Sequence, residues 1–288
     1  MKRTKREVMQ KRKFGQTGEV VPVIGQGTYK FSTTKNELDA GIQALQRGID
    51  LGMTHIDTAE MYRTEEVVGE AIKSVPREKL FIVSKVMPSN ATYQGTIAAC
   101  EKSLKNLGTD YLDCYLLHWR GSIPLSDTIK GLERLIDDGK IRSMGVSNFD
   151  VYDIEEALGI ATHPIACNQI LYNLFTRAPE HQLMPLCATK KIAVVAYTPF
   201  GKTRIPDVGT KSGDVLHALA EKHATTVRQI MLSFIVRDEN VFTIPKASSE
   251  QHVSENAGAG KVILEEEDIK QLDQVFPMPK NSEPLEMN

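Results

Sequence analysis

The sequence lacks the features that define several large classes of protein. Its 288 residues include only four cysteines (Cys100, Cys114, Cys167 and Cys187), and no two of them form a C-x-x-C pair. A disulfide framework, a zinc ribbon and a thioredoxin-type site are therefore not expected, and reduced thiols in a cytoplasmic protein fit best. The 35 basic and 37 acidic residues nearly balance, which argues against a nucleic-acid partner.

Long hydrophobic runs are also missing. A long stretch without a formal charge, residues 159–176, is interrupted by Pro164 and by amide side chains, so no membrane span is expected. The first residues, MKRTKREVMQKRK, are charged throughout and contain no apolar segment of a secretory signal. We expect residues 1–12 to form a mobile, charged lead-in.

What the chain does contain is an ordinary globular composition, with 41% hydrophobic residues and 20 glycines. Short apolar runs along the chain have the character of parallel strands that are buried on both faces. These runs are residues 21–28, 54–58, 80–86, 111–117, 141–146, 164–170, 192–197 and 241–244.

Between these runs the apolar residues recur at helical spacing. Residues 38–49 and 97–107 each place their apolar side chains on one face, and Gly108 is a natural helix stop after the second. This alternation predicts either a closed (β/α)8 barrel or an open, doubly wound sheet. The open nucleotide-binding sheet usually carries G-x-G-x-x-G after its first strand, but the GQG at residues 25–27 lacks the third glycine.

The segment KFGQTGEVVPVI, before the first barrel strand, is typical of a hairpin that turns at Thr17-Gly18. We therefore predict a single α/β domain over residues 1–288. Its fold is a (β/α)8 TIM barrel with an N-terminal β-hairpin that closes the bottom.

Polar side chains mark the ends of the expected strands, where a parallel barrel carries its chemistry. Lys85 lies near the end of an apolar strand, where a charge is costly unless paired, and Asp57 on the neighbouring strand is the expected partner. A structural ion pair explains these two residues as well as catalysis does. Tyr62 and His118 at the same rim favour catalysis, because an ammonium lowers the pKa of a nearby phenol and an imidazole can orient a substrate oxygen.

The chain resembles the aldo-keto reductase family in segments that follow one another in the family's order. They are GMTHIDTAEMYRTEEVVG, LFIVSKV, DYLDCYLLHW, GKIRSMGVSNF and TIPKASSEQHVSEN. The resemblance covers nearly the whole chain, from the hairpin to about Asn256. It implies a barrel enzyme that reduces aldehydes and ketones with NADPH. It also implies that Asp57, Tyr62, Lys85 and His118 form the catalytic tetrad, with Tyr62 as the general acid.

The same resemblance implies a coenzyme site. Ser147, Asn148 and Gln169 would hold the nicotinamide carboxamide, and Tyr197 would stack on the ring. The other positions that match the family's coenzyme site are Thr28, Lys246, Glu255 and Asn256, and Tyr29 matches the pocket wall.

Two positions of the phosphate-binding segment depart from the common family pattern. The serine that often follows Lys246 is Ala247, and the arginine that often grips the 2′-phosphate is His252. An imidazole offers a phosphate at most one donor, whereas a guanidinium binds it through a bidentate fork. Ser248 and Ser249 are candidates to compensate with their hydroxyl groups. NADP(H) is the expected coenzyme, with a modest preference that leaves NAD(H) open as well.

The substrate is expected to be a small carbonyl compound in a pocket lined by Tyr29, Trp119 and Phe200. The segments that would wall this pocket are short: residues 120–127, residues 201–213 and the tail from Phe276 onward. They predict an open site for small aldehydes, ketones or sugars. No metal is expected, because neither H-E-x-x-H nor a similar ligand cluster occurs. His55, inside an expected strand, is interpreted as a core histidine with its hydrogen bonds satisfied.

The family resemblance makes a monomer the expected state, and two other functions stay open on the sequence alone. A coenzyme-binding regulatory protein, a role that some relatives play beside ion channels, would use the same fold and could retain the tetrad. An isomerase or aldolase could form a Schiff base on Lys85, but the residues that match the nicotinamide site would then have no purpose.

Overall fold

The computed structural model describes residues 8–31, 35–202, 205–281 and 283–288. The described chain begins with an antiparallel hairpin of β1 (Lys11–Lys13) and β2 (Val20–Pro22), whose turn contains Gly18 at a φ of 81°. The predicted hairpin is thus confirmed. In the described part of the predicted lead-in, residues 8–12, Gln10 is buried and its backbone N–H donates to the Gly260 carbonyl. The rest of that lead-in lies outside the described residues.

The side chain of Phe14 shows how the hairpin closes the barrel. Its ring is fully buried, with centroids 4.7 Å from Phe81 and 5.1 Å from Phe242. These two residues lie at or near the N-terminal ends of barrel strands. The hairpin therefore seals the N-terminal end of the barrel and leaves the opposite end for a functional site.

Eight parallel strands form the barrel and follow one another around it in chain order. They are β3 (Gln26–Gly27), β4 (His55–Asp57), β5 (Phe81–Val86), β6 (Cys114–Leu117), β7 (Met144–Ser147), β8 (Ile165–Leu171), β9 (Ala193–Tyr197) and β10 (Val241–Thr243). The ring closes where Gly25 N donates to Thr243 O at 2.8 Å and Thr243 N donates to Val23 O at 2.9 Å. The (β/α)8 barrel predicted from the sequence is confirmed.

The strand predicted over residues 21–28 is divided between two sheets. Its first residues pair in the hairpin as β2, and only Gln26–Gly27 pairs with β4. The chain turns from one sheet into the other at a crowded point, where a Cβ on Gly25 would lie 2.9 Å from the ring of His55. A Cβ on Gly27 would lie 2.5 Å from the carbonyl oxygen of Ile244, so only glycine permits this closure.

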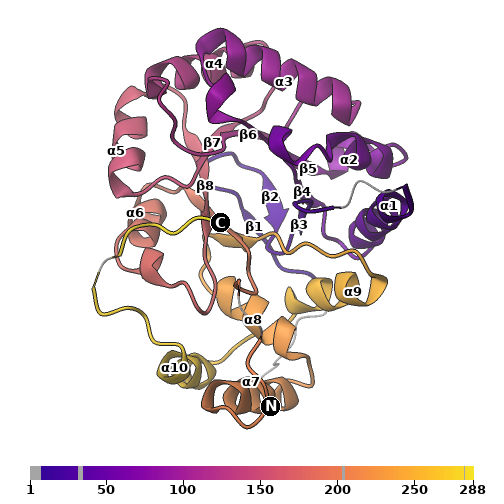
Figure 1. Ribbon diagram of the computed structural model, residues 1–288, viewed down its shortest axis with the longest axis vertical. Helices are drawn as coiled ribbons and strands as arrows, with labels where there is room; N and C mark the ends of the chain where they lie inside the picture. The colour runs from indigo at the N-terminus through magenta and orange to yellow at the C-terminus, as the bar shows by residue number, and fades with distance from the viewer. Residues whose placement is uncertain (1–7, 32–34, 203–204, 282) are drawn as a thin grey trace.

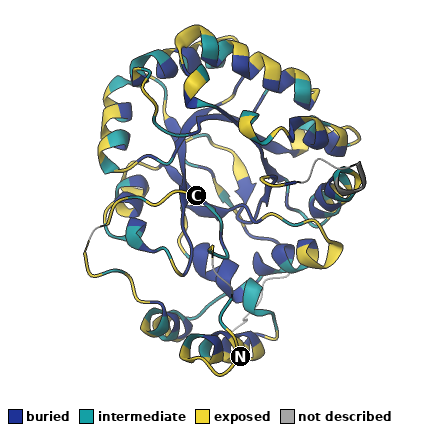
Figure 2. Ribbon diagram, viewed as in Figure 1, coloured by how far each residue is buried: buried dark blue, intermediate teal, exposed yellow. Residues whose placement is uncertain are grey.

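Helices cover the outside of the barrel (Figure 1). They are α1 (Lys35–Asp50), α2 (Glu65–Ile72), α3 (Tyr93–Leu107), α4 (Leu125–Asp137), α5 (Val151–Ile160), α6 (Leu183–Thr189), α7 (Lys211–Lys222), α8 (Val227–Ile235), α9 (Glu250–Ala259) and α10 (Glu266–Val275). Figure 2 shows that their inner faces are buried and their outer faces exposed, as the helical spacing predicted. The α3 helix ends as predicted, because Gly108 takes the left-handed conformation at its C-terminus.

Two of these helices, α7 and α10, pack together beyond the ring that encloses the barrel (Figure 1). With α8 they enclose a second apolar core that includes Leu216, Phe234 and Leu272. This side of the molecule adjoins the segment after β9, which walls the site described below.

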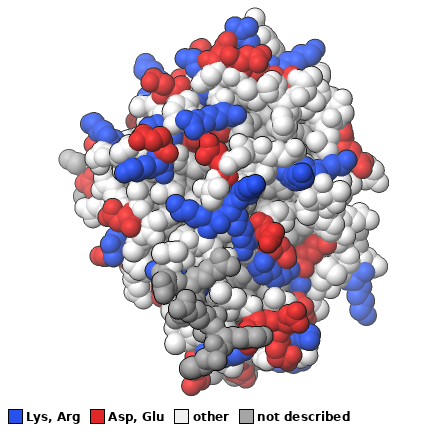
Figure 3. Space-filling view, turned by 180° about the vertical axis from the view of Figure 1, so that it is seen from behind, with Lys and Arg blue, Asp and Glu red and all other residues white. Residues whose placement is uncertain are grey.

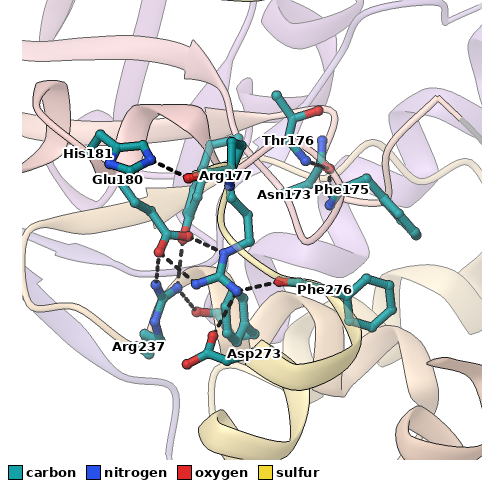
Figure 4. A network of polar contacts seen from close by, with 12 residues as sticks. Asn173, Phe175, Thr176, Arg177, Glu180, His181, Arg237, Asp273 and Phe276 are labelled. Atoms are coloured by element: carbon teal, nitrogen blue, oxygen red, sulfur yellow. Dashed lines mark hydrogen bonds and ion pairs between the residues drawn. The ribbon is translucent and has the colours of Figure 1, made fainter. Parts of the chain in front are cut away.

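A partly buried ion-pair network ties the segment after β8 to α10 (Figure 4). Arg177, only 5% exposed, donates to Glu180 and Asp273, each at 2.7 Å, and to the Phe276 carbonyl at 2.6 Å. Arg237 contacts the same Glu180 carboxylate at 3.0 Å. Charges taken out of water are tolerated when each is paired and hydrogen-bonded, as these are.

The turn beside this network reaches the segment after β9. Asn173 accepts hydrogen bonds from the backbone N–H groups of Phe175 and Thr176 and donates to the Thr198 carbonyl at 3.0 Å (Figure 4). A Cβ on Gly201 would lie 2.6 Å from the Phe175 ring. Close packing and hydrogen bonds therefore hold residues 198–201 in place.

Figure 3 shows the face of the molecule that is turned away from the viewer in Figure 1, and acidic and basic side chains are interspersed on it. Among the described residues, no helix has the length and apolar character needed to cross a membrane.

Candidate active site

A cavity of about 440 Å³ opens at the C-terminal end of the barrel. Its lining comes from the ends of successive strands and from the segments that follow them. The residues are Gly27, Thr28, Tyr29, Asp57, Met61, Tyr62, His118, Trp119, Ser147, Asn148, Gln169, Tyr197, Thr198, Pro199, Phe200, Gly201, Ile244, Lys246, Met287 and Asn288. Most of the site residues predicted from the sequence therefore meet in one place.

A buried ion pair lies at the floor of this cavity. Lys85 Nζ donates to Asp57 Oδ1 at 2.5 Å and to the Thr58 carbonyl at 2.8 Å. Gln169 Nε2 donates to the second carboxylate oxygen of Asp57 at 2.7 Å. Burial lowers the pKa of the Lys85 ammonium and raises that of the Asp57 carboxyl, while their mutual contact opposes both shifts. The pairing that the sequence predicted for Lys85 is present.

Tyr62 is carried into the cavity by a short 3-10 turn, Glu60–Tyr62, directly after β4. The Glu60 carboxylate anchors this turn by accepting from Met87 N at 3.0 Å and from Asn90 Nδ2 at 2.6 Å. The Tyr62 hydroxyl oxygen lies 3.4 Å from His118 Nε2. Lys85 Nζ lies 4.9 Å from the centroid of the Tyr62 ring.

The pKa of Tyr62 differs from the sequence-based expectation. We expected the Lys85 ammonium to lower it, whereas burial, together with the negative charge of Asp57, raises it well above the ordinary value. The reason is geometric, because Lys85 directs its hydrogen bonds to Asp57 and Thr58 and not to the phenol. Tyr62 therefore holds its proton firmly.

His118, at the end of β6, is a neutral imidazole. Burial and the nearby Lys85 charge lower its pKa to about 3. Its Nδ1 is buried and has no hydrogen-bond partner among the described residues. A buried N–H without an acceptor costs more than a buried acceptor without a donor, so we assign the proton to Nε2, the nitrogen that faces Tyr62.

The residues predicted to hold the nicotinamide carboxamide form one connected cluster. Asn148 Nδ2 donates to Ser147 Oγ at 3.1 Å and to the His118 carbonyl at 3.0 Å, and Ser147 Oγ donates to the Gln169 carbonyl at 2.9 Å. The Tyr197 hydroxyl donates to Asn148 Oδ1 at 2.7 Å. Asn148 itself has a φ of 60°, a conformation that asparagine tolerates better than most residues.

The other predicted coenzyme residues lie in two places. Thr28 borders the cavity and donates from its hydroxyl to the Asp57 carbonyl at 3.0 Å. Lys246, which follows β10, also borders it and donates to Ser248 Oγ at 3.2 Å. The hydroxyl of Ser249 caps α9 by accepting from the backbone N–H of His252. In both contacts the serine oxygen accepts, so the O–H groups of Ser248 and Ser249 stay available as the donors that we expected to compensate for His252.

Farther along α9, Glu255 and Asn256 offer unpaired oxygen atoms. Glu255 Oε2 and Asn256 Oδ1 are buried and lack hydrogen-bond partners among the described residues. Buried acceptors of this kind are stabilised when a ligand brings donors to them. Together with the amide cluster and the cation of Lys246, they fit a nicotinamide dinucleotide.

The predicted pocket residues Tyr29, Trp119 and Phe200 all line the cavity. The ring centroids of Tyr29 and Tyr62 are 5.0 Å apart, and those of Trp119 and His118 are 4.8 Å apart. Aromatic rings therefore form two walls of the cavity, one at Tyr29 and Tyr62 and the other at His118 and Trp119.

Sequence reasoning missed several lining residues, of which Met61, Met287 and Asn288 matter most. The tail returns to the barrel mouth, where Lys202 Nζ donates to the Met287 carbonyl at 2.8 Å and Asn288 Nδ2 donates to Thr198 Oγ1 at 2.6 Å. Figure 1 shows the C-terminus over the centre of the barrel. The tail was expected to leave an open wall, and no sequence signal predicted its contacts with residues 198–202.

The family of the chain follows from comparison with known proteins. A model of the aldo/keto reductase family matches residues 23–276. The chain belongs to this family. A methylglyoxal reductase of Escherichia coli (strain K12) is 40% identical over 284 residues, covering 97% of this chain and 100% of the relative. A glyoxal reductase of Bacillus subtilis (strain 168) is 38% identical over 258 residues, or 89% of each chain.

A solved structure extends this agreement to the fold. An aldo/keto reductase from Klebsiella pneumoniae, in complex with NADP and acetate, aligns with a TM-score of 0.91 and 40% identity. The alignment covers 98% of this chain and 100% of that one. The protein is thus an NADP(H)-dependent oxidoreductase that reduces carbonyl compounds, as the family resemblance implied. Among the described residues, no group of His, Cys, Asp or Glu side chains is arranged to hold a metal ion.

Proposed function

We propose that the protein reduces small aldehydes with adjacent carbonyl groups, of the methylglyoxal type, with Tyr62 as the proton donor. The observation that carries the catalytic assignment is the pair of Tyr62 hydroxyl and His118 Nε2, 3.4 Å apart at the wall of the cavity, beside the buried pair of Lys85 and Asp57. Both groups can meet one carbonyl oxygen, which is the geometry that protonation of a developing alkoxide requires.

The coenzyme supplies a hydride to the carbonyl carbon, and this chain supplies the proton and the orientation. Tyr62 transfers its phenolic proton to the carbonyl oxygen as the C–O double bond becomes single, and the alcohol leaves. His118 donates from Nε2 to the same oxygen and stays neutral, so it orients the substrate without losing a proton. Lys85 lies close enough to stabilise the phenolate that Tyr62 becomes, and solvent then returns the proton.

Asp57 serves as a positioning residue in this scheme. Its carboxylate accepts from the Lys85 ammonium and also from the Gln169 amide. Asp57 therefore connects Lys85, the neighbour of Tyr62, to the amide cluster. Ser147, Asn148 and Tyr197 complete the proposed nicotinamide site. Lys246 and the exposed His252 provide the phosphate-binding side from β10 and α9, and the imidazole in place of a guanidinium at position 252 supports some use of NAD(H).

The proposed substrate class has two supports. The E. coli and B. subtilis relatives are named methylglyoxal and glyoxal reductase, and the Klebsiella neighbour holds acetate together with NADP. The second support is the tail, because Met287 and Asn288 add a wall to the cavity, and an added wall favours small substrates. We propose that the active form of the protein is a cytoplasmic monomer.

The test is NADPH oxidation with methylglyoxal by wild type and by Tyr62→Phe, with Tyr152→Phe as the matched control because Tyr152 is 79% exposed and outside the cavity. We expect Tyr62→Phe to lose at least about a hundredfold in kcat. Its coenzyme affinity, followed by the fluorescence of Trp119, the single tryptophan, should stay close to wild type. Unchanged turnover in Tyr62→Phe would exclude this proton donor.

The same assay separates the alternative functions. Tight NADPH binding without turnover of any small aldehyde or ketone would favour the regulatory protein. Inactivation by borohydride in the presence of a carbonyl substrate, without coenzyme, would favour a Schiff base on Lys85.

A further inference from the structure

Arg228 is a cation at the edge of the cavity that neither the proposed catalytic groups nor the predicted coenzyme residues include. It lies in the first turn of α8 and is partly buried. Its guanidinium carbon is 3.8 Å from the centroid of the Phe200 ring, and Phe200 lines the cavity. A guanidinium this close to an aromatic face is held by the ring quadrupole and has little freedom to move away.

The hydrogen-bonding capacity of Arg228 is not used up within the chain. Its Nε is buried and has no hydrogen-bond partner among the residues that the structure describes. The carboxylate of Glu255 on α9 is the charged group that favours its ionised form, whereas burial lowers its pKa. A planar cation with an unpaired donor is well suited to bind a phosphate group.

Helices α8 and α9 pack against each other, and the Glu255 carboxylate lies close enough to Arg228 to favour its charged form. Gln229, next to Arg228, donates to the Glu255 carbonyl at 2.9 Å. The adjoining helices thus present an unpaired donor on Arg228 and unpaired, buried acceptors on Glu255 and Asn256. A ligand that carries both an amine and an anionic group would satisfy all three, and the adenine nucleotide of a dinucleotide has both.

The phosphate-binding segment before α9 has reason to need a second cation. Lys246 is exposed, and the Ser248 and Ser249 oxygens only accept in their contacts with Lys246 and with the His252 backbone N–H, so these hydroxyls can add neutral donors but no positive charge. His252 is exposed, and its imidazole offers at most one donor to a phosphate.

We propose that Arg228 binds the adenine nucleotide of the coenzyme, with its guanidinium held on Phe200 and its N–H groups directed to a phosphate. The inference rests on the proposed binding of NADP(H) in the cavity and beside α8 and α9, and it is independent of the roles of Tyr62 and His118. Arg228 would supply from α8 the guanidinium that α9 lacks at position 252.

The experiment measures equilibrium dissociation constants for NADPH and NADH, by quenching of Trp119 fluorescence and by calorimetry, without a carbonyl substrate. The variants are Arg228→Gln and Arg228→Lys, with Arg142→Gln as the matched control. Arg142 also contacts an aromatic ring, at 4.2 Å from Tyr111, but it lies outside the cavity.

We expect Arg228→Gln to raise the Kd of NADPH about tenfold, the size of one charge-assisted phosphate contact. Arg228→Lys should recover part of the loss because it retains the charge, and Arg142→Gln should bind like wild type. A loss confined to NADPH assigns the contact to the 2′-phosphate, and an equal loss for NADH assigns it to the pyrophosphate.

Two results would overturn the proposal. One is an unchanged Kd for both coenzymes in Arg228→Gln with an unchanged melting temperature. The other is an equal rise in the Kd of uncharged adenosine, measured by calorimetry in the same variant. That result would mean that Arg228 contacts the base and not a phosphate. If Arg228→Gln proves unstable, Phe200→Leu removes the ring that holds Arg228 in place and should weaken NADPH binding in the same direction. Because these readouts need no turnover, a failed proton-donor assignment would leave them unaffected.

Discussion

Lys85 Nζ lies 2.5 Å from Asp57 Oδ1, and both side chains are at most 1% exposed. The two residues come from adjacent strands, β4 and β5, so the backbone of the barrel fixes their separation. Desolvation opposes the charge on each residue, and only their contact and the further hydrogen bonds from Gln169 and to Thr58 keep the pair ionised.

Removing one member of this pair should destabilise the fold more than removing both. Lys85→Met leaves the Asp57 carboxylate buried without its cation, and we expect the free energy of unfolding to fall by about 3 to 5 kcal/mol. Asp57→Asn combined with Lys85→Met leaves a neutral amide that still accepts from Gln169, and much of that loss should be recovered. Urea unfolding followed by Trp119 fluorescence measures both changes.

Activity should separate from stability in the same series. The double variant folds but lacks the ammonium next to Tyr62, so its turnover of methylglyoxal should remain at least about a hundredfold below wild type. Recovered turnover in the double variant would mean that the pair is a structural feature only.

Much of this site could be predicted from the sequence, for physical reasons that are visible in particular residues. A lysine in an apolar strand must have a partner, so Lys85 indicated Asp57 before the structure was known. The period of the helices and the Thr17-Gly18 turn predicted the barrel and its hairpin. Burial of individual groups, by contrast, depends on packing between distant segments. The raised pKa of Tyr62 and the return of the tail to Thr198 had no local signal.

His55 shows the same limit within the core. The prediction that it is a core histidine is confirmed, because it is fully buried between Phe14 and Phe81. The prediction that its hydrogen bonds are satisfied is wrong, because neither ring nitrogen has a partner among the described residues. Strand position indicates burial, but the aromatic neighbours that exclude hydrogen bonds come from the hairpin and from another strand.

The pH dependence of the reaction should reflect the neutral state of His118. Its pKa of about 3 leaves the imidazole uncharged throughout an ordinary assay range, and the raised pKa of Tyr62 keeps the phenol protonated. A neutral dihydronicotinamide ring bound beside them would bury both groups further and shift both values in the same directions. We therefore expect kcat/KM for methylglyoxal at saturating NADPH to be flat from about pH 6 to about pH 9. A step near pH 6.5 that disappears in His118→Gln would contradict this assignment.

His55 should make the fold sensitive to acid. Burial, with the Lys85 charge, lowers its pKa from 6.5 to about 3, so the folded protein keeps it neutral while the unfolded chain protonates it below about pH 6.5. The unfolded state binds more protons in this window, and the free energy of unfolding therefore falls as the pH decreases from about 6.5 toward 3. Between about pH 7 and pH 5 the loss from this residue should be about 2 kcal/mol.

The variant that tests this is His55→Leu, which keeps an apolar side chain of similar size but cannot titrate. Urea unfolding at both pH values should show a smaller loss of stability in this variant than in wild type. His217→Gln is the matched control, because His217 is an exposed histidine of α7 that lies outside the core, and the wild-type difference between the two pH values should persist in this variant. An unchanged difference in His55→Leu would mean that other groups cause the acid sensitivity.

The tail should set the size of substrate that the cavity accepts. Met287 lines the cavity at its mouth, and the Lys202 contact to its carbonyl fixes the backbone at this position. Met287→Ala removes apolar contact from one wall, so kcat/KM for a bulky aldehyde such as 4-nitrobenzaldehyde should rise at least about threefold relative to methylglyoxal. Met278→Ala is the matched control, because Met278 lies in the same tail, is 40% exposed and does not line the cavity. An equal ratio of the two substrates in Met287→Ala and Met278→Ala would show that the aromatic wall of Tyr29 and Trp119, and not the tail, limits substrate size.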